Sequence, residues 1–135
     1  MARRKFWGWG NEGDGPNEDQ ARGIAKTLGA RFAVPVELAP EPRLEDLALP
    51  KPRVAPPPAL ADRCSVDPHA RASHTYGKSY RDIVRGARGD FAVAPDFVAF
   101  PRDEADVAAL LYWCGERGVA AIPYGGGSSV VGGVE

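Results

Sequence analysis

The sequence contains no apolar run close to the ~20 residues that a membrane-spanning helix needs. It also lacks an excess of either charge, because 17 Lys and Arg residues are balanced by 18 Asp and Glu residues. A net charge of -1 provides no electrostatic attraction toward nucleic acid, so we expect no nucleic-acid partner and no transmembrane segment. The 135 residues are 44% apolar, which is enough to build a core and argues against a disordered chain.

Cysteine and histidine are scarce, with two of each. Cys64 and Cys114 lie far apart and no secretion signal precedes them, so we expect free thiols rather than a disulfide. Cys114 falls on the apolar face of a predicted helix and should be buried. His69 and His74 have no nearby cysteine pair, so we predict no metal site and no catalytic role for either.

The first residues resemble a twin-arginine export signal, with Arg3 and Arg4 followed by aromatic residues. Such a signal requires an apolar stretch of about 7–15 residues next. Residues 8–14 are instead polar and glycine-rich, so we predict a cytoplasmic protein. Trp7 and Trp9 could stack on a ligand, but we expect them to pin this N-terminal arm onto the body of the protein.

A first helix is predicted from Asn17, an N-cap with Gln20 as its capping-box partner, to a stop at Gly29. Its apolar face comprises Ala21, Ile24, Ala25 and Leu28. Eight prolines then fall between Pro35 and Pro58, so residues 31–58 should form an extended connector with at most a helical turn at 44–49. Residues 59–72 are expected to be a loop.

A second helix is predicted to begin after Ser79, with Asp82 as capping partner, and to end at Gly89. Its apolar stripe comprises Tyr80, Ile83, Val84 and Ala87. Gly86 should weaken this helix by about 1 kcal/mol relative to alanine. Asp82 and Arg85 are expected to form a surface ion pair of little energy.

The last forty residues predict a βαβ unit. Residues 97–100 form an apolar strand, and a helix then runs from the cap Asp103 to Arg117 and Gly118. Its apolar stripe is Val107, Leu110, Leu111 and Cys114. Residues 119–122 supply a second buried strand, which should be parallel to the first.

A glycine-rich loop follows that second strand. Its glycines permit positive φ, so successive N–H groups can form a nest for phosphate oxygens without a lysine. A P-loop is excluded because no lysine occurs after Lys78, and the dinucleotide fingerprint is excluded because these glycines follow the second strand and no helix is predicted directly behind them. On the glycines alone, a flexible turn at a sheet edge remains the alternative.

The stretch from Pro95 to Gly133 resembles the start of the PCMH-type FAD-binding domain of the vanillyl-alcohol-oxidase flavoprotein superfamily. A segment ending in Phe100 and Pro101 leads into a helix, a strand and a loop of the form Pro-x-Gly-Gly-Gly-Ser-Ser, as in that family. The resemblance implies that FAD is the cofactor and that the loop's backbone amides bind its pyrophosphate. The residues implied are Pro123, Tyr124, Gly125, Gly126, Gly127, Ser128, Ser129, Val130, Gly132 and Gly133. Tyr124 could flank the flavin or pack outward.

The N-terminal residues are similar to those of one branch, the alkyldihydroxyacetonephosphate synthases (alkylglycerone-phosphate synthases) and their bacterial relatives. The similarity rests on the segment Phe6 to Gly10 and on His74, Gly77, Ser79, Asp82, Arg85, Arg88, Gly89 and Phe91. It implies synthesis of an ether-lipid precursor by exchange of an acyl group for a fatty alcohol. The substrate-handling residues of that family lie downstream, so no catalytic residue is assigned to this chain.

These observations predict an α+β chain, with a helical and proline-rich segment at 1–94 and the start of an FAD-binding domain at 95–135. We expect it to be the N-terminal part of a flavoenzyme, inactive alone, whose lipid or hydroxyacid substrate would bind a C-terminal part and whose full-length form could be a homodimer. An FAD-linked 2-hydroxyacid oxidase of the same superfamily is one alternative. A non-catalytic truncated product or anion-binding module is another.

Overall fold

The computed structural model describes residues 2–129 and 131–134 and divides into two compact units. The N-terminal unit comprises Met1–Lys5 and Gly10–Glu41, and the C-terminal unit comprises Phe6–Trp9 and Pro42–Glu135. The short segment Phe6–Trp9 therefore leaves the first unit to pack within the second. This division differs from the predicted boundary between residues 94 and 95, which remains a prediction about the FAD-binding domain.

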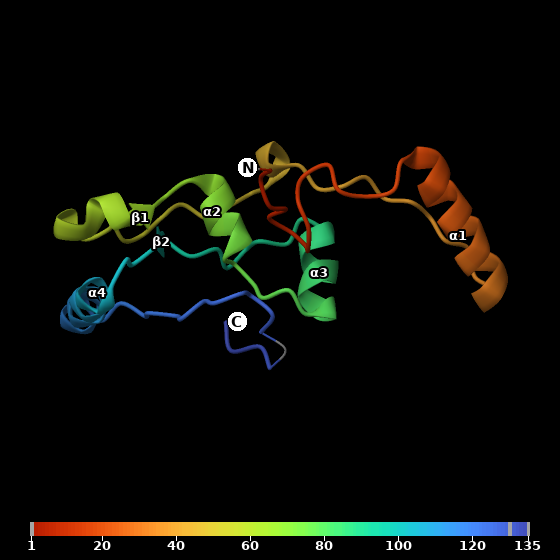
Figure 1. The fold of residues 1–135 in the computed structure, drawn as a ribbon. Helices are drawn as coiled ribbons and strands as arrows, with labels where there is room; N and C mark the ends of the chain where they lie inside the picture. The colour runs from red at the N-terminus through yellow and green to blue at the C-terminus, as the bar shows by residue number, and fades with distance from the viewer. Residues whose placement is uncertain (1, 130, 135) are drawn as a thin grey trace. The chain divides into compact units, whose positions relative to one another are not determined.

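The N-terminal unit is built around helix α1, Glu18–Phe32 (Figure 1). The predicted capping box is confirmed, because Asn17 accepts a hydrogen bond from the Gln20 amide and the Gln20 side chain accepts one from the Asn17 amide. The predicted stop at Gly29 is wrong. The helix continues past Gly29 to Phe32 and ends where Ala33 takes the left-handed conformation, at φ 52°, and donates its amide to the Gly29 carbonyl.

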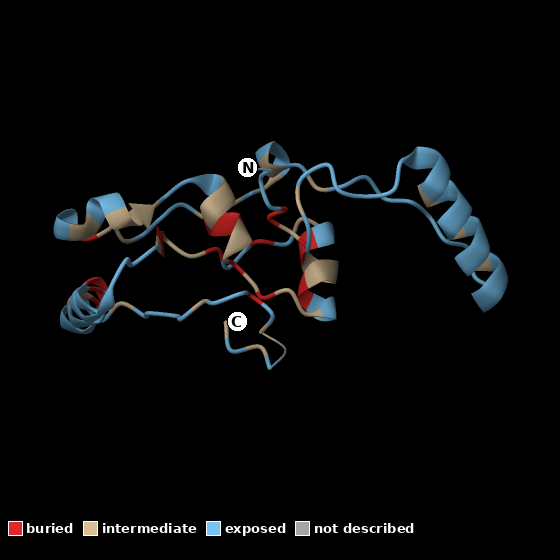
Figure 2. Ribbon diagram, in the orientation of Figure 1, coloured by how far each residue is buried: buried red, intermediate tan, exposed pale blue. Residues whose placement is uncertain are grey.

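None of the residues of α1 is buried (Figure 2). Ile24 and Leu28, on the predicted apolar face, are exposed, as is Phe32 at the end of the helix. Lys5 of this unit is buried, and its Nζ donates to Glu41 Oε1 at 2.8 Å. The predicted face therefore exists as a stripe, but the described residues leave it largely uncovered.

The C-terminal unit begins with short elements that the sequence predicted only in part. Leu44–Asp46 forms a single 3₁₀ turn, which confirms the helical turn expected within 44–49. The predicted loop at 59–72 is wrong, because this stretch contains most of a 3₁₀ helix, strand β1 and most of helix α2, with bounds Pro58–Arg63, Cys64–Ser65 and Pro68–Ser73. Helix α2 begins where Asp67 caps the Ala70 amide and a proline fills the first helical position, where no N–H is needed.

Helix α3, Tyr80–Ala87, has the predicted capping box between Ser79 and Asp82. Gly89 follows with φ 73°, as its predicted role at the helix end requires. The predicted apolar stripe is only partly buried, since Ile83 and Val84 are half-buried. The two buried residues of α3 are Asp82 and Gly86, whereas Tyr80 is 85% exposed.

Strand β2, Val98–Ala99, and helix α4, Glu104–Arg117, follow. Asp103 caps the helix and Gly118 ends it in the left-handed region, as predicted. Strand β2 pairs antiparallel with β1, with Cys64 opposite Ala99 and Ser65 opposite Val98.

The predicted second strand at 119–122 does not form within the described chain, where Ile122 is 56% exposed. The mixed helix-and-sheet class holds, but the parallel βαβ unit is not confirmed. An apolar run becomes a strand only where a neighbouring strand takes up its hydrogen bonds, and β2 is paired with β1 instead.

The core of the C-terminal unit joins three segments that are distant in the sequence. Phe6, Ala72 and Phe91 are buried together, and four partly buried residues pack against them, namely Trp7, Leu44, Leu47 and Leu49. The Phe6 and Phe91 rings lie 5.6 Å apart. This packing confirms that the N-terminal arm is pinned to the body of the protein, and Figure 2 shows the buried residues on α2, α3 and α4.

Candidate cofactor-binding loop

Residues 118–122 follow helix α4, and the described part of the glycine-rich loop, residues 123–129, then lies beside the start of α3. Of the residues predicted to contact FAD, Val130 lies outside the described residues. Gly125, Gly126 and Ser128 are exposed, whereas Gly127 is buried and Tyr124 is half-buried. The loop therefore has an outer side that is open and an inner side that packs on the protein.

Tyr124 anchors the beginning of the loop. Its hydroxyl lies 3.1 Å from the carbonyl oxygens of Ser73 and Tyr76 and donates to this pair. Its ring packs on His74 with the centroids 4.5 Å apart. Burial, and after it the charge of Asp82, raises the pKa of this phenol, which keeps the hydroxyl protonated as a donor. Tyr124 thus packs inward and not outward, and its place beside the flavin remains a prediction.

Gly127 anchors the middle of the loop. It adopts φ +79°, and a Cβ at this position would lie 2.4 Å from the Tyr124 hydroxyl, so only glycine fits. Its carbonyl oxygen accepts a hydrogen bond of 2.6 Å from the Lys78 amide. Because the described peptide bonds are trans, the N–H of the same peptide unit, that of Ser128, points away from Lys78.

Gly77 allows the loop to approach the N-terminal end of α3. A Cβ on Gly77 would lie 2.5 Å from the Ser129 Cβ, 3.0 Å from Asp82 Oδ2 and 3.2 Å from the Gly127 carbonyl oxygen. Sequence reasoning gave Gly77 no structural role and did not single out Lys78 as a neighbour of the loop. Gly77 could have been noticed, because it belongs to the set of residues from His74 to Phe91 that resembles the synthase family. No local sequence pattern indicated Lys78.

Asp82 lies beneath this contact and is 3% exposed, so the predicted pair with Arg85 forms but is buried and not at the surface. Its Oδ2 accepts from the Ser79 amide and hydroxyl, and its Oδ1 lies 3.7 Å from Arg85 Nη1. The Arg85 guanidinium packs over the Tyr76 ring at 5.0 Å. The carboxylate therefore serves α3 internally and does not face the open side of the loop.

The open side of the loop presents unused hydrogen-bond donors. Within the described part of the chain, the backbone amides of Gly125, Gly126 and Ser128 donate no hydrogen bond. A Cβ at Gly125 or Gly126 would meet no atom within 4 Å. Such a row of glycine and serine amides, with a serine hydroxyl beside it, fits the oxygens of a diphosphate, which need several donors and close backbone approach.

The histidines and cysteines take structural positions. His74 Nδ1 lies 2.7 Å from the Ala70 carbonyl oxygen, which can only accept, so Nδ1 carries the proton. His69 packs edge-on against Phe6 at 6.0 Å. Cys114 is buried on α4, as predicted, and both cysteines are free. Burial, followed by the charge of Asp62, raises the pKa of the Cys64 thiol, which makes it a poor nucleophile.

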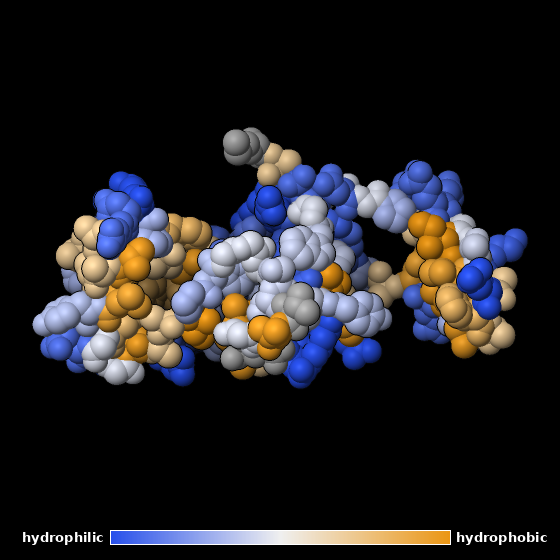
Figure 3. Space-filling model, turned by 60° about the horizontal axis from the view of Figure 1, so that its bottom comes forward, coloured by the Kyte–Doolittle hydropathy of each residue, from blue (hydrophilic) through white to orange (hydrophobic). Residues whose placement is uncertain are grey.

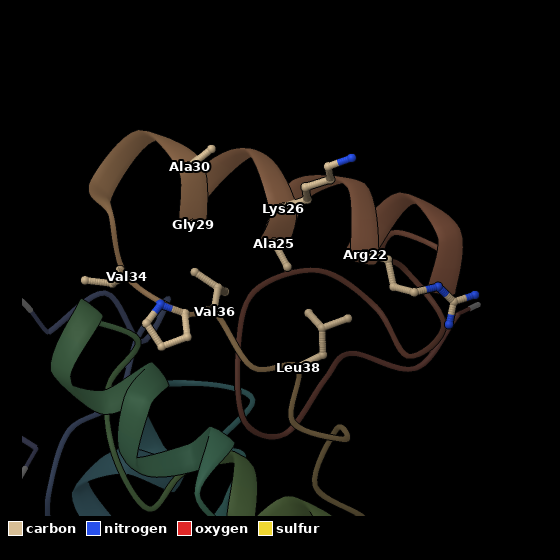
Figure 4. A pocket seen from close by; sticks show the side chains of 9 residues that line it. Arg22, Ala25, Lys26, Gly29, Ala30, Val34, Val36 and Leu38 are labelled. Atoms are coloured by element: carbon tan, nitrogen blue, oxygen red, sulfur yellow. The ribbon is translucent and has the colours of Figure 1, made fainter.

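A surface hollow belongs to the N-terminal unit and not to the glycine-rich loop. Its volume is about 460 Å³, and it lies between α1 and the segment that returns along it. Figure 4 shows Ala25, Val36 and Leu38 directed toward this space, whereas the Lys26 amine points away from it. Figure 3 shows the apolar side chains of this unit gathered at its surface. The hollow is shallow and has no titratable cluster, so the loop remains the better candidate site.

Residues 2–129 and 131–134 contain no group of three or more His, Cys, Asp or Glu side chains that could hold a metal ion. Among the same residues, no helix has the length and apolar character needed to span a bilayer.

Residues 95–135 match the protein family described as FAD binding domain. Two curated relatives match more of the chain, and both are alkyldihydroxyacetonephosphate synthases. The protein from Dictyostelium discoideum is 40% identical over 76 residues, which is 56% of this chain and 12% of that protein. The protein from Trypanosoma brucei brucei is 38% identical over 74 residues, 55% of this chain and 12% of that protein.

Two solved structures of alkyldihydroxyacetonephosphate synthase, in different crystal forms, are similar over 97% of this chain. Their TM-scores are 0.73 and 0.74 at 26% and 25% identity. The chain covers 29% and 28% of those structures, so it spans less than a third of them and about an eighth of the curated relatives. The predicted resemblance is confirmed, as is FAD as the cofactor of the matched domain.

Proposed function

We propose that residues 123–133 bind the pyrophosphate of FAD in a protein that is a synthase of the alkylglycerone-phosphate type. The observation that carries this proposal is the open row of amides at Gly125, Gly126 and Ser128, held in place from behind by Tyr124 and Lys78. The match of residues 95–135 to an FAD binding domain supports the identity of the ligand.

The chain's own residues have a limited set of tasks in this function. The amides of Gly125, Gly126 and Ser128 would donate to the pyrophosphate oxygens, and the Ser128 hydroxyl would add a further donor. Val130, Gly132 and Gly133 remain predicted contacts of the cofactor. When bound, FAD supplies the flavin ring at which the substrate reacts. No residue of this chain is assigned a catalytic role.

Alanine substitution at Gly126 tests the pyrophosphate site directly. A Cβ there meets no protein atom within 4 Å, so Gly126→Ala should leave the fold intact and obstruct only the approaching cofactor. We expect FAD affinity, measured by flavin fluorescence in the full-length protein, to fall at least tenfold, the equivalent of about 1.4 kcal/mol. Gly115→Ala on α4, where a Cβ also finds open space, is the matched control and should bind FAD as the wild type does.

The activity of the whole protein is tested separately. We expect the full-length protein to exchange the acyl group of acyl-dihydroxyacetone phosphate for a fatty alcohol, and to leave a 2-hydroxy acid with an electron-accepting dye unchanged. Rapid bleaching of the flavin by the hydroxy acid would assign an oxidase instead. Tight FAD binding without either reaction would leave a binding function alone. Equal FAD affinity of Gly126→Ala and wild type would refute the loop as the pyrophosphate site.

A further inference from the structure

The segment Phe6–Trp9 is bound to Lys78 by two hydrogen bonds of opposite direction. Trp9 Nε1 donates to the Lys78 carbonyl oxygen at 3.0 Å, and Lys78 Nζ donates to the Gly8 carbonyl oxygen at 2.8 Å. The Lys78 ammonium also lies 6.0 Å from the centroid of the Trp9 ring, within range of a cation–π contact. Both the backbone and the side chain of Lys78 are therefore held by residues about seventy positions earlier in the sequence.

The same segment is fixed from its other side by the core. Phe6 is buried against Phe91, and Trp7 packs against the same cluster. Helix α3 approaches Trp7 so closely that a Cβ on Gly86 would lie 2.8 Å from the Trp7 carbonyl oxygen. The segment is thus a rigid support and not a loose arm, and it can transmit its position to Lys78.

Lys78 in turn determines the direction of one loop peptide. Its amide donates to the Gly127 carbonyl oxygen at 2.6 Å, which sends the Ser128 N–H to the opposite, open side. We propose that Lys78, held by Phe6–Trp9, is a positioning residue that orients the Ser128 amide toward the pyrophosphate. This inference rests on the proposed function of the loop. It adds that the tryptophan–glycine segment belongs to the cofactor site although it does not touch the cofactor.

Three variants of the full-length protein test the connection. Trp9→Phe removes the donor to the Lys78 carbonyl while keeping an aromatic ring at a position that is 51% exposed, so the fold should tolerate it. Lys78→Met removes the ammonium and keeps most of the side-chain volume, and Lys78→Arg restores a cation. In the absence of cofactor, the residue-78 amide should exchange its hydrogen about tenfold faster in Trp9→Phe and Lys78→Met than in wild type. The amides of α3 should keep their protection.

The effect of these variants on pyrophosphate binding is measured as the ratio of the dissociation constants of FAD and riboflavin, because riboflavin carries no pyrophosphate. Trp9→Phe and Lys78→Met should weaken FAD about tenfold and leave riboflavin unchanged, and Lys78→Arg should regain most of the FAD affinity. A general loss of structure would weaken both ligands together and would overturn the positioning role. Unchanged exchange at residue 78, or an unchanged ratio in variants of a wild type that binds FAD, would overturn it as well. Failure of the wild type to bind FAD would refute the proposed function itself.

Discussion

Replacing Gly86 by alanine separates two physical effects of opposite sign. Gly86 lies in the middle of α3, where alanine should stabilise a helix by about 1 kcal/mol. The structure places the Trp7 carbonyl oxygen, Cβ and Cα at 2.8, 3.1 and 3.2 Å from the position of a new Cβ. A backbone carbonyl cannot rotate aside as a flexible side chain does, so one of the two elements must move.

The net change in stability is the steric cost of the new methyl group minus the gain in helix propensity. Forcing an extra methyl group into a well-packed site costs about 1–3 kcal/mol. Trp7 has little freedom to yield, because Phe6 before it is buried in the core and Gly8 after it is hydrogen-bonded to Lys78. Taking a cost of about 2 kcal/mol against a gain of about 1 kcal/mol, we expect a net loss of about 1 kcal/mol. For a unit of roughly a hundred residues this lowers Tm by about 4 °C.

Thermal unfolding followed by circular dichroism measures this effect, with Gly115→Ala as the internal reference. Gly115 is also helical, on α4, but a Cβ there meets no atom within 4 Å. This second variant should therefore raise Tm, by the propensity gain of about 1 kcal/mol. If Gly86→Ala raised Tm as much as Gly115→Ala does, the close approach of Trp7 to α3 would be refuted.

Three further predictions concern buried polar groups. Tyr124→Phe leaves two carbonyls without their donor and should cost about 1 kcal/mol of stability. Because the pKa of Tyr124 is raised by burial, its stabilising contribution is present below the ordinary value of about 10 and is lost as pH rises through the raised one. A denaturation series at alkaline pH should therefore fall less steeply in the variant than in wild type, and parallel curves would contradict this. Hydrogen bonds from the Arg102 amide and then Arg63 lower the pKa of Asp106, so its contribution is present above the ordinary aspartate value and disappears as pH falls through the lowered one. Asp106→Asn should be less stable at neutral pH and show a flatter acid limb, and an acid limb as steep as in wild type would argue against the pair. Arg71 is buried and donates to the carbonyls of Pro95 and Pro50 at 2.6 Å each. Arg71→Met should therefore lower the free energy of unfolding, measured by urea titration, by about 3 kcal/mol. A change within error would mean that water replaces the guanidinium.

The helix starts were predictable because each depends on residues three positions apart. Asn17 with Gln20, and Ser79 with Asp82, form capping boxes that the sequence displays directly. Asp103 and Gly118 likewise fix both ends of α4 by local hydrogen bonds and a local left-handed residue. For these features the sequence neighbours and the spatial neighbours are the same residues.

The buried face of α3 was not predictable from periodicity. The apolar stripe predicted Tyr80 as a packing residue, yet the buried residues are Asp82 and Gly86, because Gly77 lies beside Asp82 and Trp7 lies beside Gly86. The strand expected at 119–122 failed for a related reason, since its formation depends on a partner strand that the described chain does not supply. Both outcomes are decided by distant residues that a local pattern does not contain.

The candidate site also contains one part that the sequence predicted and one part that it did not. The glycines and serines of the loop, with their capacity to present amides to phosphate, were recognisable from composition and from a family resemblance. The supports behind the loop were not, because Tyr124 bonds to carbonyls about fifty residues away and the Gly127 carbonyl meets Lys78. A backbone donor has no side-chain signature, so no sequence pattern could have singled out Lys78.

The bonds between Phe6–Trp9 and Lys78 also impose an order of events on folding. They connect residues 69 and 70 positions apart, so closing them costs more chain entropy than forming α3 or α4. Contacts of such long range form slowly compared with helices. We therefore expect the glycine-rich loop to reach its final geometry late, after the helices and after the first residues of the chain have docked. In a stopped-flow refolding experiment, flavin capture should lag behind the helical signal, and the lag should lengthen in Trp9→Phe.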